Sequence, residues 1–175
     1  MEAEIVLLAD RPELAAGWAE LHWREWGTEP GREALAWWVA DAERAMEREQ
    51  VPVAFVAVDG AGAVLGGVGI HEFDLVERRD RSPWVVGTIV RADLRGAGIG
   101  QALMSHLAFW AIRVGIPRLW VATEHARAFY ERRGFQFVEE LAPQRGEVVS
   151  VLTQQLTLRE LTLRTHTQSA PTRRA

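Results

Sequence analysis

Apolar residues recur along the chain with two different spacings, and these spacings predict strands and helices. Short apolar runs of strand length are separated by turn residues such as Asp59-Gly60. The predicted strands cover 2–9, 51–58, 64–75, 84–90, 118–123, 135–141 and 147–156. Segments with apolar residues three and four positions apart predict helices instead. These helices cover 12–27, 33–49, 100–114 and 124–134.

The order of these elements, β-α-α-β-β-β-α-β-α-β-β, predicts the fold class. Strands joined by short turns pair as antiparallel hairpins, whereas the strand–helix–strand unit over 84–123 requires a crossover. We therefore expect an α+β fold in which a mixed, mostly antiparallel central sheet carries helices on both faces. The domain is expected to span 1–158, and the polar segment 159–175 is expected to be a flexible tail.

Composition narrows the classes of function. The 175 residues suit one domain, and the absence of cysteine excludes disulfides and thiolate zinc sites, so no metal is expected. A formal net charge of −4 disfavours a nucleic-acid partner. No apolar run is long enough to span a membrane, and the N-terminus lacks the basic start of a signal peptide. We therefore expect a cytoplasmic protein.

The segment "DLRGAGIGQAL" (93–103) carries the clearest candidate chemistry. Gly96, Gly98 and Gly100 alternate between a predicted strand and a predicted helix, directly after Arg95. The first amides of a helix have no internal acceptor and carry the positive end of the helix dipole, so such a junction binds anions. A plain turn is the alternative, but it accounts for one glycine more readily than for three.

Two other glycine motifs do not fit this segment. A P-loop needs a lysine, and the chain contains none. A dinucleotide fingerprint, Gly-x-Gly-x-x-Gly, fails because its last position falls on Gln101 or on Leu103.

Two segments of the chain resemble motifs of the GCN5-related N-acetyltransferase (GNAT) superfamily. The first is "VRADLRGAGIG" (90–100), which matches at Val90, Arg95, Gly96, Gly98, Ile99 and Gly100. It departs at Ala92, where proline is usual. The second is "LWVATEHARAFYERRGF" (119–135), which matches at Ala126, Phe129, Tyr130, Gly134 and Phe135. Thr123 stands there in the place of a common asparagine. The resemblance also covers the order of elements from residue 2 to about 158.

This resemblance implies acetyl-CoA as co-substrate. Its pyrophosphate would bind the amides of Gly96, Ala97, Gly98, Ile99, Gly100 and Gln101, with Arg95 alongside. The pantetheine arm would pair with the backbone of Ile89 and Val90, where that strand splays from the next one. Thr123 and Phe129 would line the far side.

The resemblance also places Tyr130, the only tyrosine, at the position of a frequent general acid. A phenol can protonate the thiolate that leaves when the thioester breaks. The alternative is a packing residue. A backbone N–H near Val90 would serve the oxyanion.

The general base and the acceptor pocket are less defined. The strand before the glycine loop lacks the glutamate that many family members carry, and Thr88 is its nearest polar side chain. His71, Glu72 and Asp74 are candidate proton acceptors or merely solvated residues, and strand alternation places Glu72 and Asp74 on one face. The candidates for the acceptor pocket are His22, Trp23, Glu25, Trp26, His71 and Thr88, with Glu25 pairing to a cation of the substrate; for each, core packing or a solvated position is the alternative.

These observations predict an acetyl-CoA-dependent N-acetyltransferase that acetylates a primary amine of a small molecule by direct attack. A non-catalytic sensor of acyl-CoA is the alternative from another class, because the glutamate is missing. A nucleotide-binding α/β domain is a third. Dimers are common in the family, so a homodimer stays an open alternative.

Overall fold

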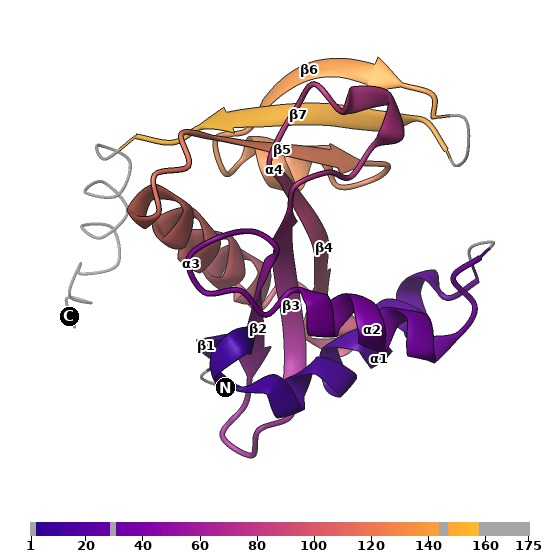
Figure 1. Cartoon of the computed structure of the whole chain (residues 1–175), viewed down its shortest axis with the longest axis vertical. Coiled ribbons are helices and arrows are strands. Elements are labelled where there is room, and N and C mark those ends of the chain that lie inside the picture. Colours follow the sequence, from indigo (N-terminus) through magenta and orange to yellow (C-terminus); the bar gives the residue numbers. More distant parts are fainter. Residues whose placement is uncertain (1–2, 29–30, 144–146, 158–175) are drawn as a thin grey trace, which may run out of the picture.

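The fold is built on one seven-stranded sheet. The computed structural model describes residues 3–28, 31–143 and 147–157, and the tail expected at 159–175 lies outside them. The strands lie in the order β1-β2-β3-β4-β5-β7-β6 (Figure 1). Their bounds are β1 Glu4–Leu7, β2 Val53–Val58, β3 Val64–His71, β4 Trp84–Val90, β5 Arg118–Thr123, β6 Gln136–Leu141 and β7 Val149–Gln155. Only β4 and β5 run parallel, so the predicted α+β fold with a mixed, mostly antiparallel sheet is confirmed.

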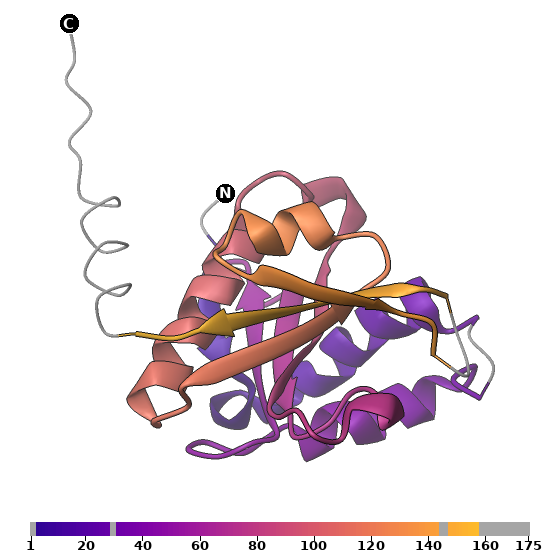
Figure 2. The same cartoon turned by 90° about the horizontal axis from the view of Figure 1, so that it is seen from above.

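Helices cover both faces of this sheet. The helices α1 (Ala15–Trp26) and α2 (Leu35–Arg44) lie on one face, while α3 (Ile99–Arg113) and the short α4 (Arg127–Glu131) lie on the other. The apolar run of β2 shows why both faces are needed. Alternate residues of that strand enter the two cores, so every position is apolar and buried. Figure 2 shows β5, β7 and β6 lying across the ends of the first four strands.

Two predicted elements are shorter than their sequence patterns. The helix predicted over 33–49 ends at Arg44, because Met46 forms a bridge with Val53 and Glu47 N donates to Pro52 O at 3.2 Å. The helix predicted over 124–134 begins only at Arg127. Thr123 Oγ1 accepts a hydrogen bond from Ala126 N at 3.0 Å, so the preceding residues form a turn.

Two predicted strands are also shorter. In the first strand, predicted over 2–9, the described residues form a strand at Glu4–Leu7, and 3₁₀ turns at Leu8–Asp10 and Pro12–Leu14 lead from it into α1; residue 2 lies outside the described residues. The return strand predicted over 64–75 ends at His71, opposite the first residue of β4. The alternation expected for Glu72 and Asp74 therefore does not apply, because neither residue is in a strand.

An irregularity in β4 shapes the centre of the sheet. Gly67 of β3 pairs with Ile89, and Gly69 pairs with Val86, so two residues of β4, Gly87 and Thr88, stand opposite one residue of β3. This is a β-bulge, and Gly87 has a φ of +58°, which favours glycine. A glycine inside an otherwise apolar strand pattern was the sequence signal for this bulge.

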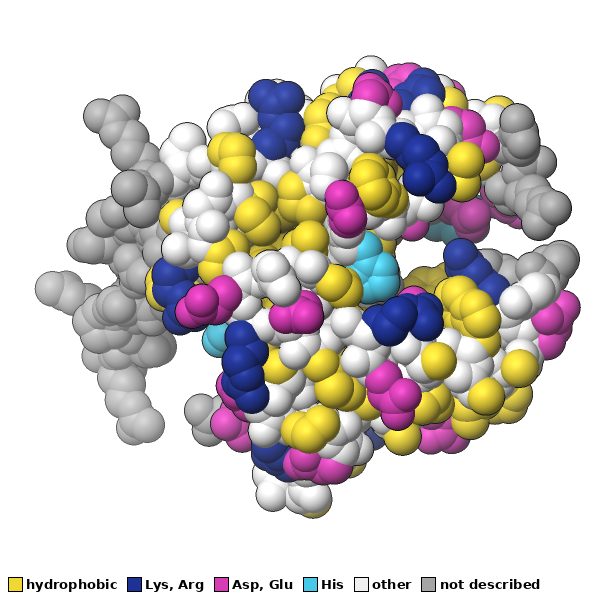
Figure 3. Space-filling model, in the orientation of Figure 1, with side chains coloured by type: hydrophobic (Ala, Val, Ile, Leu, Met, Phe, Trp, Pro, Cys, Tyr) yellow, Lys and Arg dark blue, Asp and Glu magenta, His cyan; other side chains and the backbone are white. Residues whose placement is uncertain are grey.

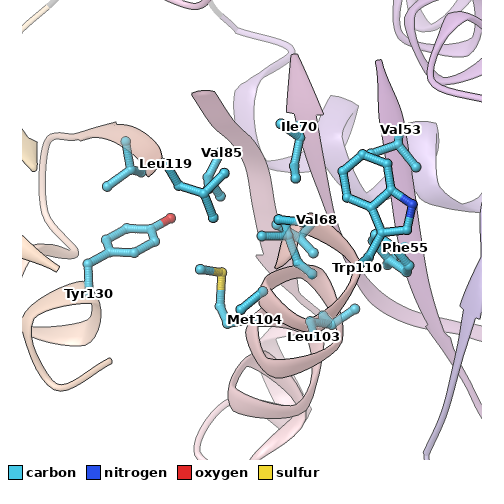
Figure 4. Packing of buried hydrophobic residues seen from close by; sticks show 14 of the residues in the cluster. Val53, Phe55, Val68, Ile70, Val85, Leu103, Met104, Trp110, Leu119 and Tyr130 are labelled. Carbon is cyan, nitrogen blue, oxygen red and sulfur yellow. The ribbon is translucent and has the colours of Figure 1, made fainter. Parts of the chain in front are cut away.

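At its other edge, β4 separates from β5 and leaves a gap between the two strands. Their pairing covers only Trp84 with Trp120 and Val85 with Val121. Beyond these pairs the two strands diverge, as the resemblance implied. Figure 4 shows Tyr130 beside Val85 of β4, with its hydroxyl pointing between Val85 and Met104.

An ion-pair network fastens the loop between β3 and β4 to the edge strand β6. Glu139 of β6 contacts Arg78 Nη2 at 2.6 Å and Arg81 Nη1 at 2.5 Å. The hydrogen bond from Arg78, followed by the Arg81 contacts, lowers the Glu139 pKa to about 2, against the opposing effect of burial. Because this pKa is depressed, the stabilisation is complete above the ordinary glutamate pKa and is lost as the pH falls toward 2.

We expect Glu139→Gln to lower the melting temperature at pH 7 by about 2–4 °C, the shift typical of losing one partly exposed network in a chain of this size. Thermal unfolding of both proteins at intervals from pH 7 to pH 3 measures the difference. The difference in melting temperature between the two proteins should shrink below about pH 4.5. A difference in melting temperature that stays constant over this range would show that the ionised Glu139 does not cause it.

Candidate active site

The glycine loop connects β4 to α3 through a short 3₁₀ turn at Ala92–Leu94. Gly96 and Gly98 both have a φ of +86°, and Gly98 is the N-cap of α3. A Cβ at either position would meet nothing within 4 Å. Backbone conformation, rather than crowding, therefore requires glycine at these two positions, and both face open space.

The first turn of α3 leaves backbone donors available at this loop. No side chain caps the helix, and Ala102 N is the amide that donates to Gly98 O, at 3.0 Å. The amides of Ile99, Gly100 and Gln101 precede it and have no acceptor within the helix. The loop thus presents N–H groups and the positive helix end to solvent, which suits a phosphate.

Phe129 of α4 closes over the start of α3. A Cβ on Gly100 would lie 3.2 Å from the Phe129 ring and 3.6 Å from Val90 Cγ2. The third glycine is therefore required by close packing, not by its conformation. The structure brings together the end of β4, the glycine loop and Phe129. Thr123 lies half-buried at the end of β5, and its hydroxyl accepts the bond that starts the turn before α4.

Arg95 is held toward α1. Its Nη2 donates to Glu25 Oε2 at 2.8 Å, and its Nε donates to Val90 O at 3.1 Å. Both side chains of the ion pair are roughly half-exposed. The sequence analysis predicted Glu25 in the acceptor pocket and Arg95 beside the cofactor. In the structure these two side chains form an ion pair with each other.

Tyr130 is buried with its phenol close to Thr88. Its side chain is 6% exposed and packs edge-on against Phe129 and Phe135. Burial raises the pKa of the phenol; the Thr88 hydroxyl opposes this rise, and the charge of Asp74 adds to it. The phenol therefore carries its proton at neutral pH. Thr88 Oγ1 is itself buried and makes no hydrogen bond of standard geometry.

His22 lies beneath β4 rather than at the surface. It is 5% exposed, and its ring packs among Trp18, Trp26 and Trp38. Its Nε2 lies 2.9 Å from the carbonyl oxygen of Gly87. Because a carbonyl only accepts hydrogen bonds, Nε2 carries the proton of the neutral ring. Burial lowers the His22 pKa to about 4, so the ring is neutral at physiological pH.

The acceptor side of the molecule carries a hollow. Figure 3 shows this hollow between the helices α1 and α2 and the part built from β5 to β7, with basic, acidic and hydrophobic side chains on its rim. Trp23 is 38% exposed, whereas Trp26 is half-buried. Burial lowers the pKa of the half-buried His71, while Glu72 is exposed.

Asp74, which follows β3, has a raised pKa. Its side chain reaches solvent, yet the surrounding protein displaces enough water to raise the pKa to about 6, with Arg32 opposing the rise. Its charge also raises the pKa of Tyr130, so the carboxyl lies within electrostatic reach of the phenol. A carboxyl that titrates near neutrality is suited to accept a proton from a reacting group.

Comparison with known proteins identifies the family. The model of the acetyltransferase (GNAT) family matches residues 15–135, which include the glycine loop and Tyr130. The chain belongs to this family. It is thus an N-acetyltransferase that uses acetyl-CoA, and the expected co-substrate is confirmed. The comparison with curated proteins found no match.

Solved structures show the same fold at low sequence identity. An aminoglycoside 6'-N-acetyltransferase complexed with coenzyme A is 18% identical, with a TM-score of 0.70, and the match covers 90% of this chain and 98% of that one. The aminoglycoside 6'-N-acetyltransferase from Enterococcus faecium is 17% identical, with a TM-score of 0.67 and coverage of 88% and 97%. A putative N-acetyltransferase from Lactobacillus plantarum is 20% identical, with a TM-score of 0.66 and coverage of 90% and 100%.

A search of the described helices for a membrane span finds none that is both long and apolar enough.

Proposed function

We propose that this acetyltransferase transfers the acetyl group of acetyl-CoA to a primary amine of a small molecule by direct attack, with Tyr130 as the general acid. The observation that carries this proposal is the buried, protonated phenol at the gap between β4 and β5. The gap lies beside the end of β4, where the glycine loop begins. A thioester sulfur that arrived along β4 would meet this phenol as a proton donor.

The cofactor would bind along one continuous surface. The amides of residues 96–101 would hold the pyrophosphate at the start of α3, and Arg95 would add a charge near it. The backbone of Ile89 and Val90 would pair with the pantetheine arm, because β5 no longer pairs with β4 at these residues. Thr123 and Phe129 would form the opposite wall.

The chemistry follows from these positions. The neutral amine attacks the thioester carbonyl carbon, and a C–N bond forms to give a tetrahedral intermediate. The C–S bond then breaks as the carbonyl re-forms, the thiolate takes the Tyr130 proton, and a proton from solvent restores the phenol. The proton lost by the attacking nitrogen passes to water or to Asp74. The products are the acetylated amine and CoA, and no covalent enzyme intermediate is needed.

A small amine is the proposed acceptor for two reasons. Two of the solved structures above are named as aminoglycoside 6'-N-acetyltransferases. Trp23 of α1 is exposed, and the exposed Glu72 and Asp74 follow β3, so an aromatic ring and two carboxylates are offered to solvent, which suits a cationic small molecule. Glu25 is occupied by Arg95, so the negative charge available to the substrate comes from the segment after β3.

The function is tested by measuring release of CoA thiol from acetyl-CoA across a panel of primary amines that includes aminoglycosides, polyamines and amino-acid amides. Turnover with at least one amine, at a rate that exceeds hydrolysis in buffer, supports the enzyme. Tight binding of acetyl-CoA without turnover on any amine would favour the sensor instead. Stabilisation by ATP or NAD that exceeds stabilisation by CoA would point to a nucleotide-binding domain.

Asp74→Asn tests the proton acceptor. An amide cannot take the proton of the attacking amine, so we expect kcat/KM at pH 7 to fall about 10²-fold, at the lower end of the usual contribution of a general base. In the wild-type protein the rate should decline as the pH falls through about 6, where Asp74 becomes protonated. This decline should disappear in the variant. Glu72→Gln, which removes a neighbouring exposed acid, is the matched control for lost negative charge. An unchanged pH profile in Asp74→Asn would remove Asp74 from the mechanism.

A further inference from the structure

We propose that His22 is a positioning residue that turns the peptide between Gly87 and Thr88, so that the N–H of Thr88 faces the acyl-transfer gap as a donor to the oxyanion. This inference rests on the proposed function, because it assigns a part of the machinery for the same reaction. In this proposal His22 acts through the backbone of β4 and does not contact the acceptor amine.

The peptide concerned stands outside the β3–β4 ladder. The register pairs Val86 with Gly69 and Ile89 with Gly67, and it leaves Gly87 and Thr88 without individual partners on β3. A buried carbonyl that has lost its ladder partner needs another donor. The Gly87 carbonyl finds it in His22 Nε2, 2.9 Å away on the α1 side of the sheet.

The surroundings of His22 argue that this bond is the reason for a histidine. Three tryptophan rings, those of Trp18, Trp26 and Trp38, surround the imidazole. An aliphatic residue would fill such a site without any cost of burying polar atoms. The described structure gives the ring one hydrogen bond, and that bond fixes the direction of a single carbonyl.

Gly87 matches this arrangement. A Cβ on Gly87 would lie 2.8 Å from His22 Cε1 and Nε2. The glycine therefore lets the ring approach the backbone, and its φ of +58° permits the turn of the peptide. His22 and Gly87 together therefore fix the orientation of the peptide at the bulge.

The direction of the carbonyl determines the direction of the next N–H. In a planar trans peptide the C=O and N–H vectors are opposed. Since Gly87 O points to His22 on the α1 side, Thr88 N–H points away from α1. The Thr88 side chain faces that same opposite side, because its hydroxyl acts on the Tyr130 phenol. The N–H donor and the Tyr130 proton donor are thereby brought to the same gap.

Such an arrangement has a clear chemical use. A preoriented backbone N–H aimed at the developing oxyanion stabilises the tetrahedral intermediate, and removal of one such donor costs about 10²–10³ in kcat. Loss of the His22 bond frees the peptide to rotate, and it withdraws the donor without removing any atom from the gap.

The test compares His22→Leu, which removes the donor to Gly87, with His22→Gln, whose side-chain amide reaches a similar point with an N–H. We expect His22→Leu to lower kcat by about tenfold to a hundredfold, while the KM for acetyl-CoA stays within about twofold. His22→Gln should recover most of the loss. Trp38→Phe, which alters the same aromatic surroundings but keeps the histidine, controls for packing and should retain its kcat. Wild-type kcat in a folded His22→Leu, or a folded His22→Gln as impaired as His22→Leu, would overturn the proposal.

A second measurement does not depend on turnover. In ¹H–¹⁵N spectra, the Thr88 amide should shift when acetyl-CoA is added and shift far less with CoA, since only the thioester presents a carbonyl to it. This difference should vanish in His22→Leu and persist in His22→Gln. A wild-type Thr88 amide that does not distinguish acetyl-CoA from CoA would refute the role of His22 even if amines are acetylated. Conversely, a clear difference without turnover on any amine would support the orientation of the Thr88 N–H by His22 and would refute the proposed function.

Discussion

Tyr130→Phe is expected to lower kcat by about 10²–10⁴-fold, the usual contribution of a positioned general acid, while the affinity for acetyl-CoA hardly changes. The phenol is buried, so it keeps its proton until the C–S bond breaks and negative charge develops on the sulfur. Phenylalanine retains the packing against Phe129 and Phe135 but has no proton to give. Steady-state kinetics, together with calorimetric titration by acetyl-CoA, separates the two quantities.

Trp110→Phe is a matched control for this variant. Trp110 is a buried aromatic residue of the same core, and its Nε1 donates to Arg48 O at 2.7 Å, away from the gap. This variant also removes a polar atom from a buried ring, so it should lose stability and keep its kcat. If Tyr130→Phe turned over as fast as the wild-type protein, Tyr130 would be a packing residue, as the alternative interpretation of the sequence allowed.

The order of the elements and the glycine loop could be predicted because local chemistry determines them. The apolar spacing gave each strand and helix, and the three glycines marked the loop before α3. The structure shows that these glycines serve different purposes. Gly96 and Gly98 allow a positive φ, whereas Gly100 allows the close approach of Phe129. Sequence spacing alone does not distinguish the two reasons.

The acceptor side was harder to predict, because long-range pairing decides it. Glu25 and Arg95 are 70 positions apart, and nothing in the pattern indicated that they form an ion pair. His22 was predicted as a residue of the acceptor pocket, with core packing as an alternative, but the bulge at Gly87 gives it a backbone carbonyl to bind inside the core. The shorter helix at 35–44 has the same origin, since Met46 pairs with Val53 instead of continuing the helix. In each case a partner distant in sequence outweighs the local preference.

Gly98→Val is expected to abolish detectable binding of CoA. The glycine is the N-cap of α3 with a φ of +86°, and it stands in open space where the pyrophosphate would approach. A valine there both strains the loop and places two methyl groups between the amides and the phosphates. Hydrogen bonds to a charged group contribute about 1.5–3 kcal/mol each, so losing two of them weakens binding by at least about 100-fold. Calorimetric titration with CoA measures the effect.

Gly115→Val separates the local effect of this valine from the strain that it introduces. Gly115 follows the other end of α3, has a φ of +82°, and also has nothing within 4 Å of a Cβ. The substitution therefore imposes a similar backbone strain on the same helix without approaching the glycine loop, and both variants should lose comparable thermal stability. If only Gly98→Val loses CoA binding, the loss follows from blocked amides at the start of α3. If Gly98→Val binds CoA as the wild-type protein does, the pyrophosphate lies elsewhere, and the assignment of the loop fails.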